Sequence, residues 1–288
     1  SYDAPVGLMF HLSDPPELNV AIPFSDYLIG RAVGAGGATV LEQFVKALRD
    51  FWTASKFEDF WQSHQAFYDD VEKRASEDIS LESVVETLED YFGMRQHSYN
   101  VILAPAFLGN YGPRVKVNGS FDVYSVLCPM RIEGNAPVFG GAVIHEFAHS
   151  FVNPLTDEFL GEFRDPERLY RPIAAKMAAM AYGNWATMIN EHIIRAVEIR
   201  LFNRTGELNL EETRGFIYIK PVFNLLSKYD RERYESFRAF YPEIVTLFNE
   251  LEPPTPFIET PLGIATVSSV AIVIMILVFI LLKKRLRK

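Results

Sequence analysis

The stretch "GGAVIHEFAHSFVNP", from Gly140 to Pro154, places two histidines four residues apart, with a glutamate directly after the first. On a helix, residues i and i+4 point the same way, so His145 and His149 can both direct a ring nitrogen at one ion. Glu146 is rotated from them by about 100°, which places its carboxylate beside the ion instead of on it. In that position the carboxylate can accept a proton from water bound to the ion.

The alternative is a core helix that happens to contain two histidines. Apart from Glu146, the segment "AVIHEFAHSF" has no charged residue and no proline, as expected of a buried helix across a cleft. Two unpaired histidines in a core cost stability unless something satisfies them, and a metal does so. We therefore expect a metal site with one Zn²⁺ per chain, held in part by His145 and His149.

A catalytic zinc needs a third protein ligand and an open position. The helical stretch "NEHIIRAVEIRL" offers Glu191, His192 and Glu198, whereas "SFVNPL" after His149 excludes the longer HExxHxxGxxH pattern. Because Glu191, Arg195 and Glu198 share one polar face, we expect Glu191 to be the ligand, held in place by Arg195. His192 is the alternative ligand. The competing interpretation is a solvated ion-pair stripe, with Glu198 paired to Arg195.

The combination of "HEFAH" and a distant "NEHIIRA" resembles the gluzincin metallopeptidases, whose helix-borne HExxH is completed by a later glutamate. More narrowly, "HEFAHSFVNP", "NEHIIRA" and "GFIYI" resemble an uncharacterised, mainly prokaryotic family of predicted gluzincin-like peptidases, over roughly residues 90–250. The resemblance implies a zincin-like fold with a small antiparallel sheet above the metal helix. It assigns His145, His149 and Glu191 to the metal and makes Glu146 the general base.

One departure from that pattern is the interval of 41 residues between His149 and Glu191, which is longer than in the best-known gluzincins. We expect its segment "DEFLGEFRDPERLYRP" to be an inserted loop over the cleft. A second donor usually stabilises the oxyanion in such a reaction. Tyr218, in "GFIYIKP", is our first candidate and Tyr182 the other. An extended substrate is expected along the strand "FDVYSVLC".

These residues predict a zinc metallopeptidase that acts on peptide or protein substrates. Two alternatives stay open at this point. The first is a binding ectodomain that kept the zincin fold without the chemistry, and the second is a zinc hydrolase of a non-peptide amide.

The rest of the folded region predicts an α+β protein that is mostly helical. Residues 1–97 read as N-terminal strands, "VGLMFHL" and "LNVAIPF", followed by helices over 38–93 that stop at Gly93. Residues 98–250 read as the zincin-like catalytic region. It opens with the strand-like segments "YNVILAPAF", "RVKV" and "FDVYSVLCP", taken as a small antiparallel sheet. Further helices are expected over 167–203, 211–229 and 231–250.

The end of the chain predicts a membrane anchor. Residues 251–261 form a Pro-rich spacer, and 262–282 are long and apolar enough for one transmembrane helix. The basic tail, 283–288, is expected to stay in the cytoplasm, which places the body outside the cell. We infer that an N-terminal export signal was removed or omitted, because the chain begins "SYDAPVG".

Charge limits the partners of the folded body. The formal net charge is -9; without the last six residues, 23 Lys and Arg stand against 37 Asp and Glu, which leaves -14. Phosphate contacts need Lys and Arg, so we expect no nucleic-acid partner.

Overall fold

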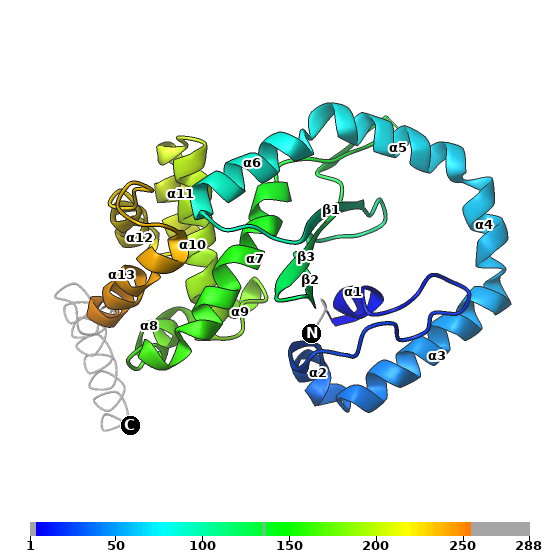
Figure 1. The fold of residues 1–288 in the computed structure, drawn as a ribbon, viewed down its shortest axis with the longest axis horizontal. Helices are drawn as coiled ribbons and strands as arrows, with labels where there is room; N and C mark the ends of the chain where they lie inside the picture. Colours follow the sequence, from blue (N-terminus) through cyan, green and yellow to red (C-terminus); the bar gives the residue numbers. More distant parts are fainter. Residues whose placement is uncertain (1–3, 135, 255–288) are drawn as a thin grey trace, which may run out of the picture.

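The computed structural model describes residues 4–134 and 136–254. The protein is a mixed α+β protein, mostly helical, with two small sheets (Figure 1). Its helices are α1 (Ala4–Met9), α2 (Asp26–Ala32), α3 (Ala38–Ser55), α4 (Phe57–Ser63), α5 (Gln65–Asp78), α6 (Leu81–Phe92), α7 (Val143–Glu158), α8 (Glu167–Tyr170), α9 (Ala174–Ala179), α10 (Trp185–Leu201), α11 (Leu208–Arg214), α12 (Ile219–Leu226) and α13 (Phe237–Glu250). Its strands are β1 (Ser98–Leu103), β2 (Arg114–Val117), β3 (Ser120–Leu127), β4 (Arg131–Glu133) and β5 (Ala136–Val138).

The larger sheet is mixed, so the prediction of an antiparallel sheet is wrong for it. Its order is β1-β3-β2, with β1 parallel to the central β3 and β2 antiparallel to it. The turn between β2 and β3 is Asn118–Gly119, and both residues have positive φ, as a two-residue hairpin requires. Since β3 is paired on both sides, the predicted docking of substrate along "FDVYSVLC" is also wrong.

Helix α7 lies against this sheet and carries the HExxH motif. Gly140 and Gly141 both have positive φ and turn the chain into the helix. Pro154 lies inside α7 and cannot donate to the carbonyl of Ser150. The side chain of Gln96 donates to that carbonyl instead, at 3.2 Å, so the helix continues through the proline.

Helix α10 is the central helix of the body. It begins at the N-cap Asn184, whose side chain accepts from the backbone N–H of Thr187. Ten of its 17 residues are buried, on every side of the helix, as expected for a helix surrounded by protein. It packs against α7 on one side and α12 on another, which fixes the relative position of Glu191 and the two motif histidines (Figure 1).

The single helix predicted over 167–203 is broken into α8, α9 and α10. Pro172 and the irregular turn before Asn184, where Ala181 has positive φ, interrupt it. The segment 157–172, which overlaps the start of that predicted helix, was expected to be a loop over a cleft. That expectation is wrong, because Phe163, Leu169 and Tyr170 are buried in the main core.

The N-terminal region differs from the prediction at its start. Residues of "VGLMFHL" form the helix α1 instead of a strand, because Ala4 and Leu8, one turn apart, pack on Leu28 in a small separate core. Only an isolated bridge joins Leu12 to Val20. The helices predicted over 38–93 are confirmed as α3 to α6, and Gly93 caps the last of them with φ 62°.

Two hydrophobic cores are joined by a helical arm, which we define as residues 46–70. The small core ends at Val45 and the main core begins at Val71. The arm consists of the second part of α3, all of α4 and the start of α5, and in Figure 1 it curves away from the sheet.

Within residues 4–134 and 136–254, no helix is both long and apolar enough to cross a membrane. The predicted span at 262–282 and the basic tail at 283–288 lie outside the described residues.

Candidate metal centre

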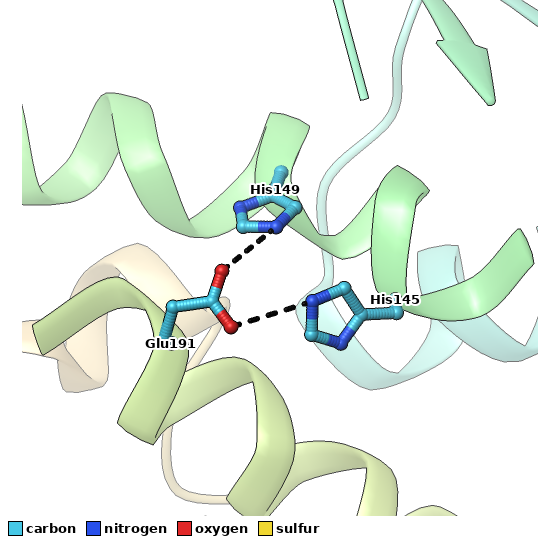
Figure 2. A group of neighbouring side chains, drawn as sticks. All are labelled: His145, His149 and Glu191. Carbon is cyan, nitrogen blue, oxygen red and sulfur yellow. Dashed lines mark ion pairs between the residues drawn. The ribbon is translucent and has the colours of Figure 1, made fainter. Parts of the chain in front are cut away.

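Helices α7 and α10 bring His145, His149 and Glu191 together (Figure 2). One ligand atom of each lies within 4.8 Å of the others. The Nε2 atom of His145 is 3.6 Å from Glu191 Oε2, and that of His149 is 3.4 Å from Oε1. Two ring nitrogens and a carboxylate therefore face one point from two helices.

The opposite ring nitrogens are both hydrogen-bonded. Nδ1 of His145 lies 2.8 Å from Glu198 Oε2, and Nδ1 of His149 lies 3.2 Å from Asn153 Oδ1. An Nδ1–H that donates to these oxygens leaves the Nε2 lone pair free for an ion. The interpretation of Glu198 as a solvated partner of Arg195 is wrong, because its side chain is 12% exposed and bonds His145.

Glu191 is buried, and its carboxylate is positioned by Arg195. Its Oε2 lies 3.2 Å from Arg195, as the sequence predicted, and Arg195 is anchored in turn by Glu211 at 3.3 Å. The same Oε2 has no hydrogen-bond partner, although a buried carboxylate oxygen without one is costly. Burial acts to raise the pKa of Glu191, but His145, His149 and Arg195 outweigh it and hold the pKa below its ordinary value.

The two histidines differ in their electrostatic surroundings. Burial lowers the pKa of His145, but Glu191 and Glu198 outweigh burial and raise it to about 10. Burial lowers the pKa of His149 to about 4. His149 therefore resists protonation. His145 lies beside two carboxylates, whose negative charge favours a cation at that position.

Glu146 lies at the same end of α7 and is buried, and burial raises its pKa to about 7. Gly112 passes directly over it. A Cβ at Gly112 would lie 2.5 Å from the Glu146 carbonyl oxygen and 3.1 Å from its Oε2. Only glycine permits this approach, which brings the segment before β2 against the carboxylate.

The donor set fits a metal ion. Two imidazole nitrogens and one carboxylate converge, each imidazole is oriented by a hydrogen bond to its opposite nitrogen, and one buried carboxylate oxygen makes no hydrogen bond. This buried group could bind a metal ion. It comprises the two histidines and the glutamate expected from the sequence.

Of the remaining sequence candidates, Tyr218 and His192 lie outside the cluster, whereas Tyr182 lies beside it. Tyr218 is buried, and its hydroxyl donates to the Leu169 carbonyl at 2.9 Å, so it is not brought to the cluster. His192 is buried between Phe216 and Tyr218 and is also outside the cluster. Tyr182 lies close to it: Arg195 donates to its hydroxyl at 3.2 Å, and burial together with the neighbouring Glu191 carboxylate raises the pKa of Tyr182.

Sequence reasoning missed how three residues, Asn153, Glu198 and Gly112, support the cluster. Asn153 follows His149 by four residues and shares its helix face, whereas Glu198 lies on the same polar face of α10 as Glu191 and bonds His145 on α7. That spacing is a signal the sequence contains. Gly112 carries no comparable signal, because its role depends on the path of a distant strand over α7.

The fold and the cluster define an α+β protein with a buried His–His–Glu group able to hold a metal ion. Residues 2–247 match the family described as "Domain of unknown function (DUF4932)", and the chain belongs to that family. No curated protein and no solved structure matches the chain.

Proposed function

We propose that this protein is a zinc metallopeptidase of the zincin type that hydrolyses peptide bonds outside the cell. The observation that carries the proposal is the convergence of His145 Nε2, His149 Nε2 and the Glu191 carboxylate, with Glu146 beside them. The donor types favour zinc, because imidazole and carboxylate ligands with an open position are typical of catalytic zinc sites.

Zinc, when bound, acts as a Lewis acid that makes nearby water more acidic and polarises a substrate carbonyl. Glu146 is the general base of the proposal, because it follows the ligand His145 on α7, is not itself a ligand, and has a pKa raised to about 7 by burial. It accepts a proton from water and then passes it to the leaving amine. The substrate backbone lies against Tyr111–Pro113, the segment that passes over Glu146.

For the second donor to the developing oxyanion we propose Tyr182 in place of Tyr218. The Tyr182 hydroxyl lies beside Glu191 and Arg195, whereas the Tyr218 hydroxyl is used by the Leu169 carbonyl. The membrane anchor at 262–282 and the outward orientation of the body stay part of the proposal, supported by the apolar run and its basic end.

The test compares the full chain with its Glu146→Gln variant in zinc content and in hydrolysis of casein and of small amide substrates. We expect about one zinc per chain in both, with hydrolysis reduced by about 10²- to 10⁴-fold in the variant. Glu158→Gln, an exposed change on the same helix, is the matched control and retains activity.

Each of the other outcomes supports a different function or a different metal site. Zinc without hydrolysis in the wild type supports a binding protein and overturns the proposal. Cleavage of small amides alone supports a non-peptide hydrolase. Full zinc content in His145→Ala shows that the metal site is elsewhere.

A further inference from the structure

The helical arm, residues 46–70, has no buried side chain over 25 consecutive residues. It belongs to neither hydrophobic core: one ends just before it at Val45 and the other begins just after it at Val71. Short helices are marginal in water unless an apolar face packs against something. The arm as described lacks that support from its own body.

The arm is nevertheless rich in aromatic side chains that contact one another. One row of rings runs through Phe51, Phe57, Phe60 and His64, with centroids 5.9, 5.4 and 4.1 Å apart. The Trp52 ring joins the same row at Phe57. A continuous row that crosses from α3 to α4 is an extended surface, in contrast to a few scattered apolar residues.

Several aromatic rings of the arm are exposed to solvent. Phe51 is 55% exposed, Phe60 45% and Trp61 39%. Each aromatic side chain can bury about 150–250 Å² of surface, so covering the exposed rings would add a large favourable contribution to the free energy of binding. Aromatic residues gathered on a surface are typical of the centres of protein interfaces.

Charge indicates what kind of partner fits. The arm contains five carboxylates and three cations, and one of those cations, Arg49, is already bonded to the main chain at Glu17 and Leu18. A second copy would bring the same acidic arm against a body of charge -14, which opposes pairing. An anionic lipid surface is disfavoured for the same reason.

We propose that the helical arm is a docking surface for a cationic, apolar polypeptide segment. The aromatic row takes the apolar side chains of the segment, and Asp50, Glu58 and Asp59 lie along the arm to meet its cations. The site is separate from the metal cluster on α7 and α10, and its occupation requires no metal and no hydrolysis.

The test titrates the full 288-residue chain with a synthetic amphipathic Leu/Lys peptide of about 20 residues, which as a helix is long enough to cover the aromatic row from Phe51 to His64. A Leu/Glu peptide and a Gly/Lys peptide of equal length are the comparisons. Trp52 and Trp61 lie on the arm, and Trp185 lies on α10, so tryptophan emission reports mainly on the arm. We expect the Leu/Lys peptide to bind and shift the emission, and the other two to bind at least tenfold more weakly.

The decisive variant is the double change Phe51→Ser with Phe60→Ser, which should weaken binding of the Leu/Lys peptide by about tenfold or more. Leu210→Ser on α11, where the leucine is 50% exposed, is the matched control and should bind as the wild type does. The far-ultraviolet circular dichroism spectrum confirms that each variant is folded.

Three results overturn the proposal. The first is equal affinity of the wild type and the arm variant, and the second is tight binding of the Leu/Glu peptide. The third is a concentration-dependent dimer in sedimentation that the arm variant abolishes, because the arm would then be covered by a second copy. All titrations are carried out in the Glu146→Gln background, so that hydrolysis of the peptides does not contribute to the measured binding.

Discussion

Helix α10 and the helical arm are both rich in apolar residues, yet they use them in opposite ways. Ten of 17 residues of α10 are buried, whereas none of the 25 residues of the arm is. The difference arises because α10 is enclosed by α7, α8 and α12, its polar face included, whereas the arm belongs to neither core. The rigid region holds the candidate chemistry, and the unsupported region presents the candidate recognition surface.

The largest expected difference between the two regions is in stability. Phe151 on α7 is 1% exposed and stacks on Phe92 at 4.6 Å, so Phe151→Ala should lower the free energy of unfolding by about 3–5 kcal/mol. Phe60→Ala on the arm should change it by no more than about 0.5 kcal/mol. Urea denaturation measures both. Equal losses would mean that the arm is packed as tightly as the core.

The next effect concerns the contact of Gly112 with Glu146. A methyl group there meets the Glu146 carbonyl oxygen at 2.5 Å, so Gly112→Ala should cost about 1–3 kcal/mol of stability and should also impair hydrolysis. Gly161 has open space around its Cβ position and serves as the control, with Gly161→Ala near neutral. If Gly112→Ala matched Gly161→Ala in thermal unfolding, the close approach would be absent in solution.

The third effect concerns zinc affinity and the hydrogen bond between Glu198 and His145. Glu198→Gln removes the carboxylate from His145 Nδ1, so we expect zinc affinity to fall by about 10- to 100-fold without loss of the fold. Competition with a chromogenic chelator measures this affinity. Glu158→Gln should leave it unchanged. Unchanged affinity in Glu198→Gln would remove Glu198 from the metal site.

The smallest effect is a pH dependence of stability that arises at Asp122 on β3, outside both regions. Ser98 donates to Asp122 at 2.6 Å, and His97 bonds the same oxygen, which holds the pKa of Asp122 below its ordinary value. A depressed carboxyl pKa adds stability above the ordinary pKa, near 3.9, and that contribution is lost as pH falls through the folded value. Because the group is near the surface, we expect less than about 1 kcal/mol.

Unfolding of Asp122→Asn, compared with wild type from pH 7 down to pH 3, checks that effect. The variant should lose stability less steeply in the acid limb. Parallel curves would show that Asp122 titrates at its ordinary value.

The sequence predicted the metal cluster better than the surrounding fold, for a physical reason. The spacing of His145 and His149 fixes their common face on any helix, and the polar face of α10 limits the third ligand to few residues. The direction in which two strands pair has no comparable pattern in the sequence. The segments of β1 and β3 are β-branched in either arrangement, so their parallel pairing was not predictable from their composition.

The tyrosines illustrate the same limit. Tyr218 and Tyr182 were both candidates, and only tertiary packing separates them: the hydroxyl of Tyr218 is used by the Leu169 carbonyl, and that of Tyr182 lies beside Arg195. The prediction of a strand before His11 was also wrong. A short apolar run fits a strand or a helix equally well, and only its packing on Leu28 distinguishes the two.

The central claim is that one zinc ion is held by two imidazoles and a carboxylate. X-ray absorption at the zinc edge of the full chain tests it most directly, since imidazole and sulfur scattering are distinct. We predict one zinc per chain with nitrogen and oxygen ligands at about 2.0–2.1 Å, two of them imidazoles, and one imidazole fewer in His149→Ala. A sulfur ligand, a shell without imidazole, or an unchanged spectrum in His149→Ala would contradict the account.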